Sequence, residues 1–238
     1  SLPGVSQSRT IRIEQDVLGE NDRHAARNRL GFDSHDVLAL NLVSSPGSGK
    51  TSLILRTIEG LQGAVKLGVI EADIDSKVDA EKVAAAGIPA VQLRTGGFCH
   101  LDATMVTQGI DALPAQRLDL IIIENVGNLV CPAEFDTGAH KNVMILSVPE
   151  GDDKPLKYPL MFTVCDVLLI NKIDYMAQSD FDVAAARERA LALKPGIKIF
   201  EVSCKTGAGL SEWINWLKKE TEDFLAGFME KNPPCLRK

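Results

Sequence analysis

The chain has 238 residues, of which 45% are hydrophobic and 24% are charged, and these values are ordinary for a globular protein with a substantial core. The formal net charge of −6 argues against a nucleic-acid partner, because binding a phosphate backbone requires a basic surface. No apolar run approaches the ~18 residues of a membrane span and no signal-peptide pattern opens the chain, so we expect a cytoplasmic protein without a membrane partner.

The chain is expected to form a single domain over residues 1–238. Residues 1–9 are expected to be disordered, and residues 10–36 to form an N-terminal helical extension in which a short extended piece precedes a surface helix. Residues 229–238 are expected to be a tail. The sequence opens on Ser1 rather than methionine, which is compatible with removal of a preceding segment.

Apolar runs alternate with helical patterns along the rest of the chain. The runs predict strands at residues 37–43, 65–70, 90–93, 118–123, 143–148, 167–170 and 197–202. Helices are predicted after residue 50 and at residues 76–86, 101–110, 155–164, 180–193 and 210–228. This alternation predicts an α/β fold with a mostly parallel sheet flanked by helices, and ligands on such a sheet bind beyond the carboxyl ends of the strands.

A glycine-rich segment, Ser44-Ser-Pro-Gly-Ser-Gly-Lys-Thr51, joins the first strand to the first core helix. Strand, glycine loop and helix in this order predict a P-loop, in which main-chain N–H groups and the helix dipole bind phosphate oxygens. Lys50 is placed to reach the β- and γ-phosphates, and the Thr51 hydroxyl to bind Mg²⁺. The predicted nucleotide-binding residues of this segment are Gly47, Ser48, Gly49, Lys50, Thr51 and Ser52.

The first position of the P-loop departs from the usual pattern, since Ser44 stands where a glycine is usual. A plain strand-to-helix turn without a ligand is the alternative reading.

The tetrapeptide Asn171-Lys-Ile-Asp174 follows a predicted strand and indicates which base is bound. The Asp174 carboxylate can accept from both N–H groups on one edge of guanine, whereas adenine would leave it unpaired. Asn171 can bond the other edge of the base and Lys172 can pack along its plane. Ser203-Cys204-Lys205 follows the next strand and offers a backbone N–H to the guanine oxygen. Together these segments predict a GTP/GDP site, although the tetrapeptide alone is equally compatible with a helix cap.

A segment at the end of the run 118–123 replaces the Asp-x-x-Gly of ordinary GTPases with Glu124-Asn-Val-Gly127. Glu124 is predicted near Mg²⁺, and the Gly127 N–H to sense the γ-phosphate. Asp73 and Asp79 are candidates to hold a Mg²⁺-bound water or to orient the attacking water, while a solvated helix charge is the alternative for Asp79. No glutamine follows Gly127, which predicts slow GTP hydrolysis.

Cys99-His100 and Cys131 form a candidate metal site, because two thiolates and an imidazole suit Zn²⁺ or Ni²⁺. Cys131 lies seven residues past Glu124, so γ-phosphate occupancy can move it. Three ligands leave a tetrahedral site open for release of the metal or for sharing across a dimer. Buried structural cysteines are the alternative, and they are what we expect of Cys165, within a core segment. The five cysteines, an odd number, predict reduced thiols or metal ligands rather than disulfides.

Four segments together resemble the hydrogenase nickel-incorporation GTPase HypB family, a SIMIBI-class P-loop GTPase, over residues 11–216. They are Ser44-Ser-Pro-Gly-Ser-Gly-Lys-Thr51, Cys99-His-Leu-Asp102, Glu124-Asn-Val-Gly-Asn-Leu-Val-Cys-Pro132 and Pro149-Glu-Gly-Asp-Asp-Lys-Pro-Leu-Lys-Tyr-Pro159. The resemblance implies a GTP-dependent homodimer that delivers nickel to the [NiFe]-hydrogenase large subunit together with a HypA-type nickel metallochaperone.

By this resemblance, Cys99, His100 and Cys131 bind Ni²⁺ or Zn²⁺ at the dimer interface. Asp73, Asp79 and Glu124 match acidic positions of the nucleotide and Mg²⁺ site. Lys154 and Lys157 match a segment that the family uses near the nucleotide and the subunit contact. Many members add an N-terminal Cys-x-x-Cys-Gly-Cys motif and some a histidine-rich tract, and the printed sequence contains neither. The family's Glu-Gly-Asp is Glu71-Ala72-Asp73 here.

Three other functions compete with this interpretation. A urease-type nickel GTPase would carry a Cys-Pro-His tripeptide, whereas Ala133 follows Cys131-Pro132 here. A regulatory GTPase with structural cysteines would bind no nickel, or bind it regardless of nucleotide. A metal-storage protein would need many more ligands than three.

Overall fold

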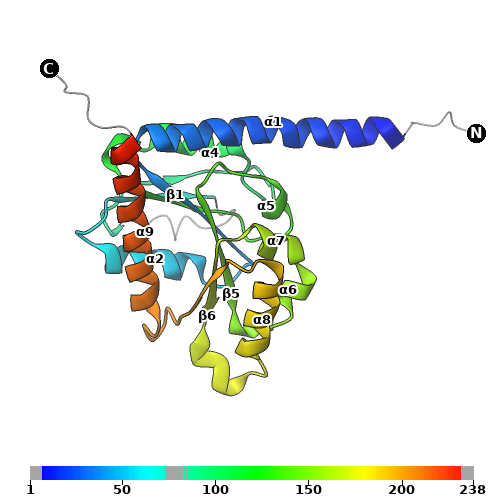
Figure 1. Cartoon of the computed structure of the whole chain (residues 1–238), viewed down its shortest axis with the longest axis vertical. Helices are drawn as coiled ribbons and strands as arrows, with labels where there is room; N and C mark the ends of the chain where they lie inside the picture. The colour runs from blue at the N-terminus through cyan, green and yellow to red at the C-terminus, as the bar shows by residue number, and fades with distance from the viewer. Residues whose placement is uncertain (1–6, 73–82, 84, 232–238) are drawn as a thin grey trace, which may run out of the picture.

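The computed structural model describes residues 7–72, 83 and 85–231, and within them the chain forms one central sheet covered by helices (Figure 1). The sheet has seven strands in the order β3-β2-β4-β1-β5-β6-β7, and all of its ladders are parallel. The strands are β1 (Leu38–Ser44), β2 (Leu67–Glu71), β3 (Ala90–Gln92), β4 (Leu120–Glu124), β5 (Lys141–Ser147), β6 (Val167–Asn171) and β7 (Lys198–Glu201). The predicted α/β fold with a mostly parallel sheet is confirmed.

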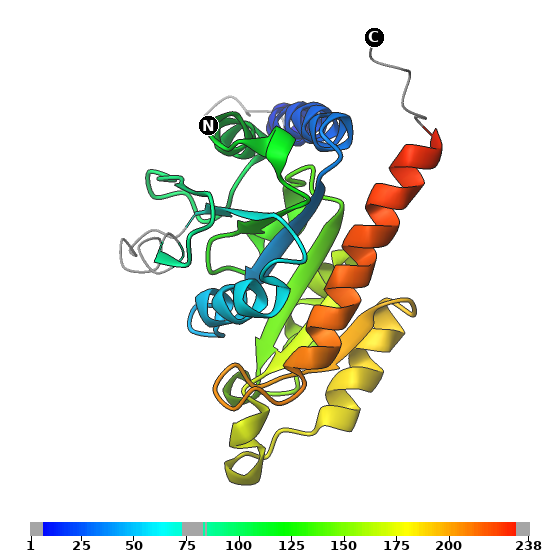
Figure 2. The same cartoon turned by 90° about the vertical axis from the view of Figure 1, so that its left-hand side faces the viewer.

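Helices cover both faces of the sheet, as Figures 1 and 2 show. The α-helices are α1 (Gln7–Ser34), α2 (Lys50–Leu61), α4 (Ala103–Ala112), α5 (Cys131–Glu134), α6 (Lys154–Lys157), α7 (Pro159–Val164), α8 (Val183–Leu193) and α9 (Leu210–Lys231). Short 3-10 turns are η1 (Ala115–Arg117), η2 (Val148–Glu150) and η3 (Ile173–Gln178).

Alternating side chains of the central strands pack on the two faces of the sheet. Leu38, Leu40 and Leu42 of β1 pack with α2 and α9 on one face of the sheet, where Trp213 is buried. Ala39 of β1 packs on the other face with residues of α1, α4 and β4. Because both faces of the sheet are covered, its strands are nearly continuous apolar runs. Such runs are easy to recognise in a sequence, so the predicted strands lie close to the observed ones.

Several predicted helices have other bounds in the structure, including those predicted over residues 101–110 and 210–228, which are Ala103–Ala112 and Leu210–Lys231. The helix predicted over residues 155–164 is divided into α6 and α7, because Pro159 has no N–H to continue the first helix. Helix α8 begins at Val183 rather than at residue 180, since the Asp182 side chain caps it by accepting from the N–H of Ala185. The helix predicted over residues 76–86 lies mostly outside the described residues.

The N-terminal segment forms one helix, so the extended piece predicted ahead of a surface helix is wrong. Helix α1 lies across α4 and its first turns extend past the body (Figure 1). The Asn28 amide donates to Ala103 O at 2.7 Å, and Asn21 Oδ1 accepts from the N–H of Ala103 at 2.9 Å. These bonds hold the first turn of α4, which directly follows Cys99 and His100 in the chain.

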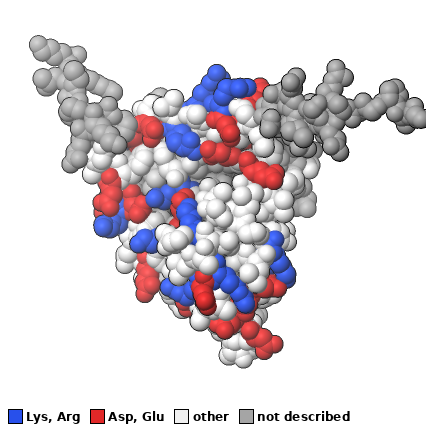
Figure 3. Space-filling view, turned by 45° about the vertical axis from the view of Figure 1, so that its right-hand side comes forward, with Lys and Arg blue, Asp and Glu red and all other residues white. Residues whose placement is uncertain are grey.

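Among the described residues, no helix combines the length and the apolar character needed to cross a membrane. Acidic and basic side chains are interspersed on the face seen in Figure 3, and the described residues there form no broad basic area.

His140, just before β5, joins both covering layers to the sheet. Its Nδ1 accepts from the N–H of Ala39 at 2.9 Å, so its Nε2 carries the proton and donates to Asp33 Oδ1 at 3.1 Å. Its ring also lies 4.6 Å from that of Phe224 on α9. Burial lowers the pKa of His140, and this effect exceeds the opposing influence of Asp33.

We predict that the free energy of unfolding falls as the pH drops below about 6.5, partly because of His140. The unfolded chain takes up a proton on this residue before the folded chain does, so acid favours unfolding until the lowered folded pKa is passed. Urea unfolding at pH 7.5 and pH 5.5 measures the effect. His140→Asn, which keeps an acceptor for Ala39, should be less stable at pH 7.5 but lose less stability on acidification, and equal losses in the two proteins would contradict the assignment.

Candidate nucleotide and metal site

The phosphate loop has two glycines in a left-handed backbone conformation and leads directly into a helix N-terminus. Gly47 and Gly49 have φ angles of 75° and 103°, which residues with a side chain rarely adopt, and α2 begins directly afterwards at Lys50. A Cβ on Gly49 would also lie 2.6 Å from the Asn171 amide nitrogen. Lys50 is buried, and its Nζ donates to Ser44 Oγ at 3.1 Å, so the serine that replaces the usual glycine contacts the lysine.

Gly127 lies against the phosphate loop, as the predicted γ-phosphate sensor should. A Cβ added to it would come within 3.0–3.2 Å of three atoms of Pro46. The segment that follows β4 is thus packed against the loop, and any larger residue at position 127 would push the two apart.

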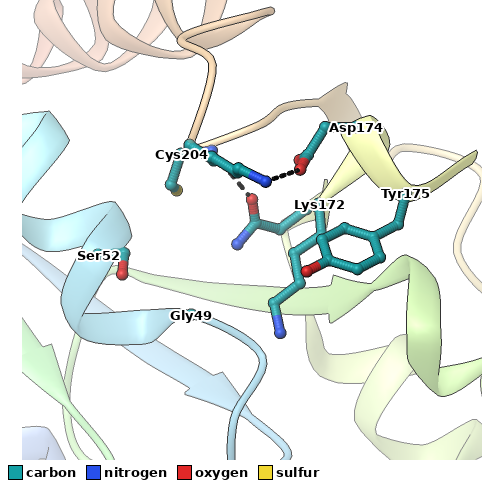
Figure 4. A pocket seen from close by; sticks show the side chains of 8 residues that line it. Gly49, Ser52, Lys172, Asp174, Tyr175 and Cys204 are labelled. Carbon is teal, nitrogen blue, oxygen red and sulfur yellow. Dashed lines mark hydrogen bonds and ion pairs between the residues drawn. The ribbon is translucent and has the colours of Figure 1, made fainter.

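A cavity of about 240 Å³ adjoins the phosphate loop and is lined by the predicted guanine-binding residues (Figure 4). Asn171 organises it, because its amide donates to Ser48 O at 2.9 Å and its Oδ1 accepts from the N–H of Cys204 at 3.3 Å. Lys172 reaches back to donate to Gly47 O at 2.7 Å. Bonds from one strand end to both the phosphate loop and the next strand end fix the width of the cavity.

Asp174 lines this cavity (Figure 4). Its Oδ1 accepts from the Ser203 hydroxyl at 2.6 Å, and its Oδ2 lies 3.9 Å from Lys205 Nζ. Tyr175, which the sequence analysis did not single out, also lines the cavity, and its ring lies 5.8 Å from Lys205 Nζ. No motif position marked this tyrosine, because only the turn of η3 brings it to the cavity wall.

Oxygen ligands gather where β2 and β4 end beside α2. The Thr51 hydroxyl lies 3.3 Å from Glu124 Oε1, and Glu124 is only 2% exposed. Glu71, 3% exposed, is the register partner of Glu124 on the neighbouring strand. The Thr51 hydroxyl and the Glu124 carboxylate are oxygen donors of the kind that Mg²⁺ prefers. The sequence analysis gave Glu71 no role. Asp73 and Asp79 lie outside the described residues.

Cys99, His100 and Cys131 come together as the candidate metal site. Their ligand atoms all lie within 4.8 Å of one another, and the Sγ atoms of the two cysteines are 3.0 Å apart. His100 Nδ1 is 3.8 Å from Cys99 Sγ, and its ring stacks on Phe135 with centroids 4.0 Å apart. The chain separates the cysteines by 32 residues, so the fold, rather than local sequence, assembles this cluster.

The cluster is electrostatically suited to a cation. Burial lowers the pKa of His100, although the carboxylates of Asp102 and Glu134 act in the opposite direction. The lowered pKa favours the neutral imidazole, which is the form that binds a metal. The hydrogen bond with Cys99 is the main cause that raises the pKa of the Cys131 thiol. A bound cation would offset this effect, since metal binding displaces the thiol proton.

Two asparagines join the metal cluster to the end of β4, and the sequence analysis missed both. The Asn128 amide donates to Cys99 O at 3.2 Å, while its Oδ1 accepts from the N–H of Val130 at 2.9 Å. Asn125 Oδ1 accepts from the N–H of Leu101 at 3.1 Å. The segment between Glu124 and Cys131 therefore contacts the phosphate loop at Gly127 and the metal cluster at Asn128.

The other two cysteines that the structure describes do not join this cluster. Cys165 and Cys204 are buried, and burial raises the pKa of the Cys204 thiol to about 11 and that of Cys165 further. Cys165 packs in the core beside α7 and α8, as predicted. Cys235 lies outside the described residues.

Comparisons with known proteins match both the fold and most of the chain. The family model "CobW/HypB/UreG, nucleotide-binding domain" matches residues 38–201. The hydrogenase maturation factor HypB of Azotobacter vinelandii is 52% identical over 218 residues, which cover 92% of this chain and 72% of that protein.

Two crystal structures superpose closely on this one. HypB from Archaeoglobus fulgidus has a TM-score of 0.81 and 41% identity, covering 85% of this chain and 99% of that one. HypB from Helicobacter pylori, in complex with nickel, has a TM-score of 0.80 and 38% identity, covering 86% and 96% of the two chains. The predicted α/β nucleotide-binding fold is confirmed.

We predict that Cys99→Ala abolishes tight Ni²⁺ or Zn²⁺ binding, because it removes the ligand that contacts both other members of the cluster. Titration of the reduced protein with each metal measures this. Cys165→Ala is the matched control and should bind metal as the unchanged protein does, since that thiol lies in the core. Unaltered binding in Cys99→Ala would exclude the cluster as the metal site.

Proposed function

Because this chain belongs to the HypB proteins of the CobW/HypB/UreG family, we propose that it is a GTP-hydrolysing metallochaperone that delivers nickel during [NiFe]-hydrogenase maturation. One observation carries the proposal. The segment from Glu124 to Cys131 contacts the phosphate loop through Gly127 and the cysteine–histidine cluster through Asn128. A change at the γ-phosphate therefore has a short physical route to the metal ligands.

GTP binding is the first step of the proposed cycle. The N–H groups of the phosphate loop and Lys50 would hold the phosphates, while Asn171, Lys172 and Asp174 would read guanine, with Ser203, Cys204 and Lys205 closing the far side. Thr51 and Glu124, with Asp73, would hold Mg²⁺, whose charge would balance the buried acids and the triphosphate. Asp73 or Asp79 remains our candidate to orient the attacking water.

The γ-phosphate would then draw the Gly127 N–H toward it and shift the segment that ends at Cys131. Because Cys131 is a ligand of the proposed nickel site, this shift would change the affinity for the cargo ion. Hydrolysis reverses the shift, and we propose that it is slow, below about 1 s⁻¹ for the protein alone, since no glutamine follows Gly127.

A homodimer would complete the nickel site. Phe98 and Val130, each next to one of the cysteines, are 57% and 54% exposed. Large apolar side chains at the rim of a three-ligand cluster favour a second copy that covers them. Lys154 and Lys157 are proposed to act near the nucleotide and the subunit contact. Further proposed partners are a HypA-type nickel protein and the hydrogenase large subunit. We propose that the protein acts in the cytoplasm.

We predict that Asp174→Asn weakens GTP binding by about 10²-fold or more while improving binding of xanthosine triphosphate. The Asp174 carboxylate would accept a hydrogen bond from the exocyclic amine of guanine, whereas an asparagine amide can donate there. Xanthine carries a carbonyl oxygen in place of that amine and can accept this bond. Competition between the two nucleotides measures the change. Asp152→Asn, outside the cavity, serves as the control. Retention of GTP preference by Asp174→Asn would show that this carboxylate does not read the base.

The delivery function is tested by loading the protein with Ni²⁺ and following nickel transfer to a colorimetric chelator. We expect the transfer rate to differ between Mg²⁺–GTP and Mg²⁺–GDP, because the two nucleotides set the Cys131 segment differently. In Lys50→Ala the nucleotide dependence should disappear. Equal rates with GTP and GDP in the unchanged protein would leave a GTPase whose cysteines serve another purpose.

A further inference from the structure

Glu150, the last residue of η2, holds the phosphate loop from outside. Its Oε2 accepts three hydrogen bonds, from the N–H of Ser147 at 2.8 Å, the Ser147 hydroxyl at 2.8 Å and the Ser48 hydroxyl at 2.7 Å. Ser48 lies between the two glycines of the phosphate loop and is 1% exposed. A carboxylate from the end of β5 thus fixes the middle of the loop that would receive the nucleotide.

The Ser48 hydroxyl has one proton and two acceptors within reach. Glu150 Oε2 is at 2.7 Å and Ser45 O at 2.9 Å. The carboxylate is nearer and charged, so it takes the stronger bond. Burial raises the pKa of Glu150, but the polar side chains of Ser45 and Ser48 and the hydrogen bonds from Ser147 outweigh this effect, and the net pKa lies below the ordinary value. The group is therefore an anion at neutral pH.

The other carboxylate oxygen of Glu150 faces helix α6. Lys154 Nζ lies 3.5 Å from Oε1, with the two side chains 16% and 14% exposed. Within the described part of the chain, this Oε1 is buried without a hydrogen-bond partner, so the lysine charge is what balances it. Lys154 also lies 5.2 Å from the ring centre of Tyr158, directly after α6.

A fixed anion beside an anion-binding loop opposes phosphate binding unless a cation stays close. Lys154 is that cation, and the phosphates of a bound nucleotide would compete with Glu150 for it. Lys154 is the first residue of α6, so a displacement that reaches its backbone would shift that helix, which carries Leu156, a leucine that is 65% exposed.

We propose that Glu150 is a positioning residue that couples occupancy of the phosphate loop to the setting of Lys154 and helix α6. The inference rests on the proposed GTP site but adds a second route out of it, on the opposite side of the loop from the route through Gly127 and Asn128. It predicts that Ser48 and Lys154, which each contact a different oxygen of the Glu150 carboxylate, are energetically linked through it.

A double-mutant cycle tests this link. The variants are Ser48→Ala and Lys154→Met, and the measured quantity is the affinity for a fluorescent non-hydrolysable GTP analogue and for fluorescent GDP. We expect the combined effect to depart from the product of the single effects by a factor of about three or more. In a Glu150→Gln background the departure should vanish, because the amide cannot attract the lysine charge. A purely structural role of Glu150 would leave the two effects multiplicative in every background.

Asp153→Asn is the matched control background, since it removes one carboxylate next to Lys154 that pairs on the surface with Lys157 at 2.7 Å. There the departure should persist. If Glu150→Gln does not fold, Ser147→Ala removes one donor to the same carboxylate and should reduce the departure. Independent effects of Ser48→Ala and Lys154→Met in the otherwise unchanged protein would overturn the inference, whereas failure of that unchanged protein to bind either nucleotide would instead overturn the proposed function.

Discussion

The parallel arrangement of the sheet is the constraint on which the site depends. Because β1, β2, β4, β5 and β6 run in the same direction, their carboxyl ends meet at one edge. The phosphate loop, Glu71, Glu124, Asn171 and Glu150 all lie at those strand ends or just after them. Their cross-strand hydrogen bonds, such as the one from Asn171 to Ser48 O, hold this edge to a fixed width. A displacement of one strand end is therefore transmitted to the neighbouring strand ends through these hydrogen bonds.

Two connections lead out of the phosphate loop, and they differ in chemistry. Toward β4, Gly127 packs against Pro46 and Asn128 bonds the backbone of Cys99, so this connection works by shape and neutral hydrogen bonds. Toward β5, Glu150 joins Ser48 to Lys154, so this one works by charge. The first ends at the metal ligands and the second at the exposed leucine of α6. The geometry of the cysteine–histidine cluster and the position of α6 are thereby open to separate adjustment by mutation.

Much of this arrangement was predictable because it is local in the sequence. Buried parallel strands are continuous apolar runs, and the phosphate and guanine segments are short motifs at strand ends. Pro159 was a visible sign of the break between α6 and α7, but helical spacing of the neighbouring apolar residues concealed it. Glu150, Asn128 and Glu71 were missed because their roles depend on partners in other strands or loops, 102 residues away for the bond from Ser48 to Glu150. No spacing rule reports such pairs.

Our central proposal is that the segment from Glu124 to Cys131 couples nucleotide binding to metal binding, so that each changes the affinity for the other. The most direct measurement is a calorimetric Ni²⁺ titration of the reduced protein, once with Mg²⁺–GDP and once with a Mg²⁺-bound non-hydrolysable GTP analogue. The account predicts different nickel dissociation constants in the two titrations, and by linkage the same factor must appear when each nucleotide is titrated with and without nickel. Identical nickel dissociation constants with both nucleotides would contradict it.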